Sequence, residues 1–88
     1  MAAWQVIYTK NALYDMEKAF AAGFKEKILS LIELIRKDPV ARYPSCEKLV
    51  GDLNVLYSRR INLKHRLVYM VDAEDKVVTI VSAWTHFE

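Results

Sequence analysis

Short runs rich in β-branched and aromatic residues occur at four places along the chain, and each predicts a strand. The runs are residues 4–8, 55–61, 65–71 and 77–84. Turn-forming residues at 62–64 and 72–76 separate the last three runs. Because both connections are short, these three strands are expected to form an antiparallel meander. The last run is apolar on both faces, so we expect it to lie centrally in the sheet.

Between the first two runs, the apolar residues change to a helical period. In residues 11–22, one stripe carries Leu13, Met16 and Phe20. Either Thr9 or Asn11 is a suitable residue to cap this helix. The helix is expected to end at Gly23, a residue type common just after a helix.

A second and longer helical stripe follows directly. Its apolar members share spacings of three and four residues: Phe24, Ile28, Leu31, Ile32 and Ile35. Asp38 is disfavoured in a helix because Pro39 follows it, so the helix should end there. The short joint at Gly23 predicts a helical hairpin.

The order of these elements is β-α-α-β-β-β, with residues 39–53 expected to be irregular. This order predicts a single domain over residues 1–88 in the α+β class. A helical hairpin would pack on a small, mainly antiparallel sheet. The composition fits a compact core, since 53% of the 88 residues are apolar and only two are glycine and two proline.

Cysteine usage and hydropathy indicate a cellular location. Cys46 is the single cysteine, which allows no internal disulfide and favours a reducing compartment. No apolar run approaches the ~18 residues of a membrane span, and no signal peptide opens the chain. We therefore expect a cytoplasmic protein with no membrane contact.

Charge is concentrated in one segment, although the net charge is only +2. Residues 59–66, RRINLKHR, hold four cations and no acid, and we call them the basic strip. Strand alternation puts Arg60 on one face with Ser58, and Arg66 on one face with Val68. Arg60 and Arg66 meet only if the register of the hairpin pairs them. Such a local strip on a nearly neutral chain is typical of a site for an anion.

Three residues near this strip suit metal-free RNA cleavage. Glu47 could take the proton of a ribose 2′-OH, and His86 could protonate the leaving 5′-oxygen. Arg66, helped by Arg60 or Arg59, could bind the phosphate. These residue types are common, so a solvated loop acid and an ordinary surface histidine remain alternatives. No metal ligand spacing and no Gly-rich phosphate loop are present, and no cofactor is expected.

A specific combination of motifs covers nearly the whole chain. The segment EKLVGDLNVLYSRRINLKHRLVY at 47–69 and the WTHF at 84–87 resemble the Txe/YoeB branch of the RelE-type toxins of bacterial toxin–antitoxin systems. The opening AWQVIYTKNALYD and the mid-chain LIELIRKDP also fit this family.

The resemblance implies a fold like that of microbial ribonucleases and cleavage of translated mRNA in the ribosomal A site. By position it makes Glu47 the general base, Arg66 the phosphate-binding arginine and His86 the general acid. Arg60 matches a supporting basic position of the family. Arg59 matches a position that contacts either RNA or the rest of the fold. The implied partners are a Phd/YefM-type antitoxin, the ribosome with its mRNA, operator DNA through the antitoxin complex only, and a possible second copy of the chain.

Two residues depart from the family pattern. Phe87 stands where relatives commonly have tyrosine, so a hydroxyl is lost while stacking on a base is kept. We expect this change to reduce activity without abolishing it. Val55 stands where relatives often have glycine, which favours a more regular start of the strand.

Several residues have simpler roles, and the function has alternatives. We expect an orienting or packing role for His65, and packing roles for Trp4, Trp84, Tyr57 and Tyr69. A catalytically weakened module that keeps RNA or ribosome binding would retain the basic strip. A pure protein-interaction domain would use the strip to bind an acidic antitoxin segment.

Overall fold

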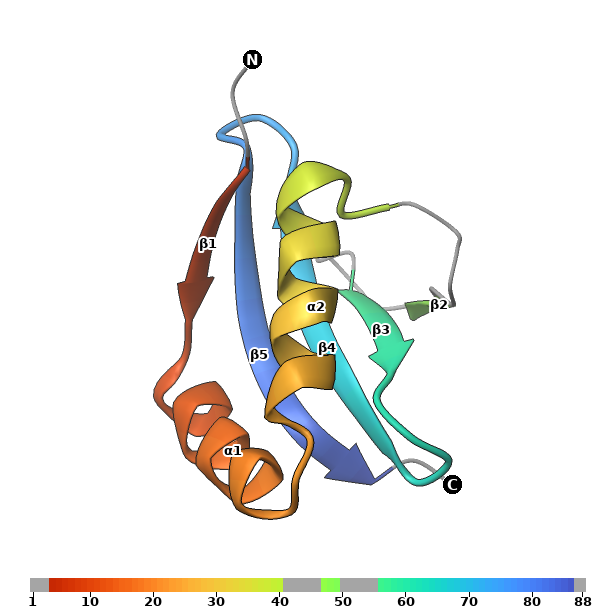
Figure 1. The fold of residues 1–88 in the computed structure, drawn as a ribbon. Helices are drawn as coiled ribbons and strands as arrows, with labels where there is room; N and C mark the ends of the chain where they lie inside the picture. The colour runs from red at the N-terminus through yellow and green to blue at the C-terminus, as the bar shows by residue number, and fades with distance from the viewer. Residues whose placement is uncertain (1–3, 41–46, 50–55, 87–88) are drawn as a thin grey trace.

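The elements follow the predicted order with one addition. The computed structural model describes residues 4–40, 47–49 and 56–86. The elements are β1 (Gln5–Tyr8), α1 (Lys10–Ala21), α2 (Lys25–Lys37), β2 (Glu47–Leu49), β3 (Leu56–Arg60), β4 (His65–Asp72) and β5 (Val77–His86) (Figure 1). The added strand, β2, lies in the stretch predicted to be irregular. It forms because its backbone pairs with β3, a partner that the sequence of residues 47–49 does not reveal.

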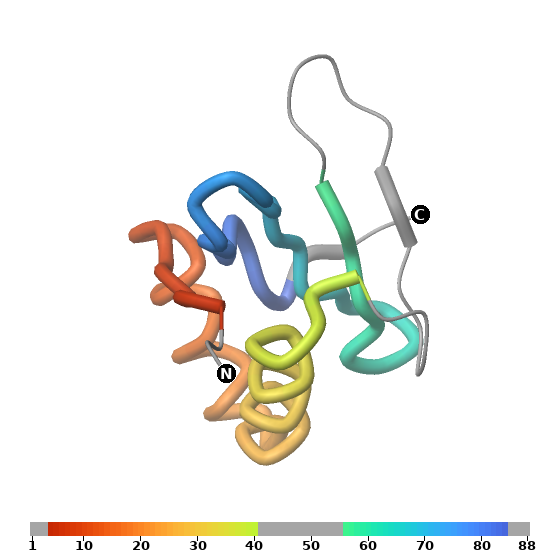
Figure 2. The backbone as a smooth tube through the Cα atoms, turned by 90° about the horizontal axis from the view of Figure 1, so that it is seen from above, coloured from red at the N-terminus to blue at the C-terminus, as the bar shows by residue number. Residues whose placement is uncertain are grey.

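The five strands form one sheet in the order β1-β5-β4-β3-β2. β5 lies between β1 and β4, which confirms its predicted central position. β1 runs parallel to β5 and the other neighbours are antiparallel, so the sheet is mainly antiparallel as predicted. Both helices lie against the same side of the sheet (Figure 2). The α+β fold with a helical hairpin is therefore confirmed.

Local hydrogen bonds define the ends of α1. The Thr9 hydroxyl accepts from the backbone N–H of Ala12 at 3.0 Å and donates to the Val81 carbonyl at 2.9 Å. Thr9 thus caps the helix and ties its start to β5. At the other end, Gly23 has a φ of +94°, and Phe24 N–H donates to the Ala19 carbonyl at 3.0 Å. This left-handed residue ends the helix as predicted.

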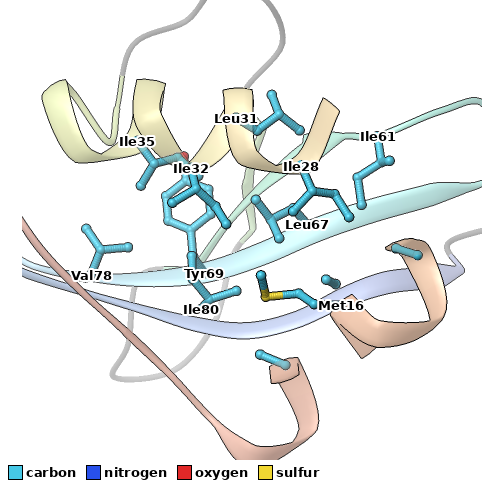
Figure 3. Close-up of a cluster of buried hydrophobic side chains, with 13 residues drawn as sticks. Met16, Ile28, Leu31, Ile32, Ile35, Ile61, Leu67, Tyr69, Val78 and Ile80 are labelled. Atoms are coloured by element: carbon cyan, nitrogen blue, oxygen red, sulfur yellow. The ribbon is translucent and has the colours of Figure 1, made fainter. Parts of the chain in front are cut away.

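The core lies between α2 and the strands β4 and β5. The predicted apolar stripe of α2 faces the sheet, and four of its members are buried (Figure 3): Ile28, Leu31, Ile32 and Ile35. They pack with strand residues that are fully buried: Leu67, Tyr69, Val78 and Ile80. Truncating one such isoleucine to alanine would cost about 2–5 kcal/mol.

The buried face of α1 differs from the predicted stripe. Leu13 is 53% exposed, while Ala12, Met16 and Ala19 are buried. The two small alanines face the sheet because they let the helix backbone come close to β5. Met16 belongs to both stripes, but Ala12 and Ala19 take the buried positions predicted for Leu13 and Phe20, so the prediction for Leu13 was wrong.

Candidate active site

The turn at residues 62–64 joins β3 to β4, and the register of this hairpin decides which basic residues meet. Arg60 is directly opposite Arg66, and Ser58 is opposite Val68. Directly opposite residues in an antiparallel pair share one face, with Cβ atoms ~5 Å apart. Leu67 and Tyr69 belong to the core, so the alternate residues face away from the helices. We call this second side of β3 and β4 the open face.

Ser58 holds the Arg66 side chain on the open face. The Ser58 hydroxyl accepts a hydrogen bond from Arg66 Nη1 at 3.4 Å. Ser58 is 1% exposed, whereas Arg66 is half-buried and Arg60 is exposed. The guanidinium of Arg66 is therefore oriented by a buried partner, and a second cation lies beside it. Two adjacent guanidinium groups make this part of the open face suitable for an anion.

Arg59 points the other way and is fully buried at 0% exposure. Its Nε donates to the Tyr69 hydroxyl at 3.0 Å, and its Nη2 donates to the Pro39 carbonyl at 3.5 Å. The Tyr69 hydroxyl also donates to that carbonyl. Of the two roles considered for Arg59, the fold contact is the one present. The predicted RNA contact has no exposed surface to act through.

Glu47 enters the site through backbone pairing of β2. Glu47 is directly opposite Ser58 on β3, and Lys48 is opposite Tyr57. Ser58 in turn binds Arg66 on β4. Because neighbouring strands lie ~4.8 Å apart, β2 and β4 are separated by about 10 Å across β3. In the register Glu47–Ser58–Val68, Glu47 is in line with Val68, two positions along β4 from Arg66.

His86 ends β5, the strand on the other side of β4. Thr85 is opposite Arg66, and His86 is opposite His65. The end of β5 thus lies beside the β3–β4 turn, at one end of the sheet (Figure 1). The backbones of Glu47, Arg66 and His86 are carried on β2, β4 and β5, around the same end of the hairpin.

The aromatic residues and His65 pack as expected. The His65 ring stacks on Trp84, with centroids 3.8 Å apart and an angle of 2° between the planes. Tyr57 stacks on the buried ring of Tyr69 at 5.8 Å. Trp4 and Trp84 are half-buried against the core. The packing roles predicted for these residues are confirmed.

Three residues discussed from the sequence, Cys46, Val55 and Phe87, lie outside the described residues. Within the described ranges, no group of three or more His, Cys, Asp or Glu side chains is placed to hold a metal ion. No helix there is long and apolar enough to cross a membrane.

Sequence reasoning missed two contacts of the site. The Ser58–Arg66 hydrogen bond follows from a register that alternation alone does not fix. The His65–Trp84 stack depends on a β-bulge, since β5 has one more residue than β4 between the pairs Arg66–Thr85 and Val68–Ser82. The bulge has no sequence signal here, because no glycine or proline lies in β5.

Known proteins resemble this chain over most of its length. Residues 8–87 match the family described as YoeB-like toxin of bacterial type II toxin–antitoxin system. The Toxin YoeB of Mycobacterium bovis is 41% identical over 61 residues, which is 69% of each chain.

Two solved structures share the fold. The YoeB dimer from Staphylococcus aureus has a TM-score of 0.80 at 32% identity, covering 98% of this chain and all of that one. The YoeB–YefM complex from the same organism has a TM-score of 0.76, with the same identity and coverage. In that second structure the relative is bound to YefM.

Proposed function

Because this chain belongs to the YoeB-like toxins of bacterial type II toxin–antitoxin systems, we propose that it cleaves translated mRNA in the ribosomal A site. The proposed reaction is a metal-free transesterification in which the ribose 2′-oxygen attacks the adjacent phosphorus. It breaks the bond to the 5′-oxygen of the next nucleotide. The products are a 2′,3′-cyclic phosphate and a 5′-hydroxyl.

Each of the three predicted residues has one part in this reaction. Glu47 removes the proton of the 2′-OH as general base, and His86 gives a proton to the departing 5′-oxygen as general acid. Arg66 binds the non-bridging phosphate oxygens, where negative charge grows in the transition state. Arg60 supports RNA binding from the adjacent position.

The observation that carries the proposal is the pairing across four strands. Glu47 is opposite Ser58, Ser58 accepts a hydrogen bond from Arg66, and Arg66 is opposite Thr85, the neighbour of His86. The pairing of these strands brings residues far apart in the sequence near the exposed Arg60 and the half-buried Arg66.

Dependence on the ribosome is supported by the small size of this cationic surface. On the described open face of β3 and β4, Arg60 and Arg66 supply the charge. Few phosphate contacts give weak binding at physiological salt, so affinity alone does not align a scissile bond. A bound ribosome would supply the alignment, which can contribute ~7–11 kcal/mol to lowering a barrier.

The proposed inhibitor is a YefM-type antitoxin. A relative 32% identical to this chain is bound to YefM in a solved complex. The exposed Arg60 and half-buried Arg66 suit an acidic segment that would compete with RNA phosphate. The proposed cleavage of mRNA on translating ribosomes would also place the chain in the cytoplasm, where these ribosomes are.

A second copy of the chain is the other proposed partner, bound through the outer face of α1. Leu13 and Tyr14 are 53% and 59% exposed there, and both line a shallow groove of about 450 Å³. Lys10 and Glu17 flank them at equal spacing along the helix. An antiparallel two-fold pairing of α1 would therefore put each Lys10 opposite the Glu17 of the other copy. Sedimentation of Leu13→Glu, compared with the parent chain, tests this pairing.

The main experiment adds the purified chain to a translating bacterial extract and maps new 5′ ends on the message. We expect ends carrying a 5′-hydroxyl inside translated codons. Glu47→Ala and His86→Ala should remove these ends, while Glu47→Asp should keep a trace of cleavage. Naked message in the same buffer should stay intact.

One result would replace the proposal by its alternative. If Glu47→Ala and His86→Ala block translation as strongly as the parent chain and no new ends form, the chain is an RNA- or ribosome-binding module without cleavage. Efficient cleavage of naked message at physiological salt would instead show that cleavage does not depend on the ribosome.

A further inference from the structure

We propose that His65 and Trp84 are positioning residues that fix the end of β5, and through it the general acid His86. This inference rests on the proposed function, in which His86 is the general acid. Three contacts of residues 83–84, and a fourth that fixes the His65 ring, support it.

The first contact is the stack between the two rings. Their centroids are 3.8 Å apart and their planes are parallel within 2°. His65 starts β4 and Trp84 lies near the end of β5, so the stack joins the two strands just before their final pair. Because aromatic stacking depends on both distance and orientation, this contact restricts the rotation of residue 84 relative to β4.

The second contact fixes the His65 ring in turn. His65 Nδ1 lies 3.2 Å from Asn62 Oδ1. The same oxygen accepts the backbone N–H groups of Lys64 at 2.8 Å and His65 at 2.7 Å. Because an amide oxygen only accepts, this contact is a hydrogen bond in the His65 tautomer that carries its proton on Nδ1. A phenylalanine at this position would stack as well but would lack the bond to the turn.

In the two remaining contacts, residues of α1 and of the start of α2 bind the end of β5. The backbone N–H of Ala83 donates to Asp15 Oδ2 of α1 at 3.3 Å. Phe24, at the start of α2, packs on Trp84 with ring centroids 5.2 Å apart. Trp84 itself has a φ of +64°, a conformation that bulky residues rarely adopt. Such a backbone persists only where the surroundings enforce it.

These contacts act on the catalytic end of the sheet because of where the bulge lies. The bulge at residues 83–84 decides that Thr85, rather than Trp84, is opposite Arg66 and that His86 is opposite His65. Without the stack, Trp84 could relax to an ordinary strand conformation, and the residues after it would shift by one position. A one-residue shift exchanges the faces of the following side chains.

The test measures single-turnover cleavage of mRNA on programmed ribosomes. His65→Ala and Trp84→Ala should lower the rate at saturating ribosome about ten- to a hundredfold, the size of effect that misplacement by ~1 Å produces. The half-saturating ribosome concentration should stay within about twofold, because neither residue binds RNA. His65→Phe should recover most of the rate, since it restores the stack.

A double variant separates positioning from general stability. If His65 acts through His86, adding His65→Ala to His86→Ala should cause no further loss of rate. Val78→Ala is the matched control, because Val78 is buried in β5 at the opposite end of the strand. It should lower the melting temperature and leave the cleavage rate of the folded protein unchanged.

A readout independent of cleavage keeps the inference distinct from the proposed function. In labelled protein, the His65 ring proton should show the upfield shift of a proton stacked on indole. The His86 ring signal should move or broaden in Trp84→Ala and not in Val78→Ala. If these signals behave as expected while the parent chain cleaves nothing, the proposed function fails and the positioning stands.

Three outcomes would overturn the inference itself. The first is a cleavage rate for Trp84→Ala equal to that of the parent chain. The second is a loss in His65→Phe as large as that in His86→Ala, which would make His65 a proton donor. The third is an additive loss in the double variant, which would show that the two residues act independently.

Discussion

Arg59 and Arg60 are neighbours in the chain but belong to opposite faces of β3. The guanidinium group is buried and hydrogen-bonded on one face and exposed to solvent on the other. Arg59 is buried on the helix side with Tyr69 and Pro39 as partners. Arg60 is exposed on the open face, opposite Arg66. On the first face the guanidinium donates hydrogen bonds through Nε and Nη2 to groups of the protein itself, so it contributes to the fold. On the second face it is available to an anion from outside.

The comparison predicts that substitutions on the two faces of β3 and β4 affect different properties of the protein. Substitutions on the helix side should act on the free energy of unfolding, and those on the open face should act on cleavage or RNA binding. The following predictions test that separation from the largest expected effect to the smallest.

Arg59→Ala should lower the free energy of unfolding by about 3–5 kcal/mol, because it leaves a cavity and removes charged hydrogen bonds to Tyr69 and Pro39. Urea unfolding followed by circular dichroism measures this change. Arg60→Ala is the matched control and should stay within about 0.5 kcal/mol of the parent. Equal losses in the two variants would contradict the difference between the faces.

Arg66→Ala should lower the single-turnover cleavage rate about 10²- to 10³-fold, the typical effect of removing one group that stabilises an oxyanion. Its melting temperature should change little, since the half-buried side chain contacts solvent. Arg66→Lys should recover part of the rate, because one positive charge remains without the bidentate geometry. A loss below tenfold in Arg66→Ala would show that another cation binds the phosphate.

Arg60→Ala should raise the half-saturating ribosome concentration about tenfold and leave the saturated rate nearly unchanged. The reason is that Arg60 is proposed to contact RNA without touching the reacting phosphate. Removing one phosphate contact should also reduce the salt dependence of binding by about one unit of slope. An unchanged slope would indicate that Arg60 contacts no phosphate.

Ser58→Ala should lower the cleavage rate about threefold, since the 3.4 Å bond from Arg66 is long and worth only part of an ordinary hydrogen bond. Thr79→Ala, at the far end of the sheet, is the control for loss of a hydroxyl. The rate is measured at saturating ribosome. A change in the half-saturating concentration alone would mean that Ser58 serves binding and not orientation of Arg66.

Much of this arrangement could be predicted because local rules apply to it. The turn residues Asn62 and Asp72 each accept hydrogen bonds from the following backbone, as their residue types favour. Gly23 ends α1, and the α2 stripe is buried as its spacing predicts. Strand alternation also put Arg60 and Arg66 on faces that could meet, and the hairpin register brought them together.

The features that the sequence did not predict depend on partners far away in the chain. Burial of Arg59 requires Pro39 and Tyr69, and the bond between those two spans thirty residues. The buried stripe of α1 contains Ala12 and Ala19, whose small side chains give a weaker pattern than Leu13. β2 has only three residues, too few for a strand signal of their own, and exists through its pairing with β3.

The parallel pairing of β1 with β5 has a consequence for the time at which the proposed site is assembled during synthesis. β5 is synthesised after every other described element, yet both β1 and β4 depend on its edges. A nascent chain that lacks β5 therefore leaves the Thr9 hydroxyl without its Val81 acceptor and the hairpin without its inner neighbour. Sequence-distant pairing of this kind slows folding. If the proposed cleavage site is the functional one, the translation machinery that makes the chain does not meet it in assembled form while the earlier strands are being produced.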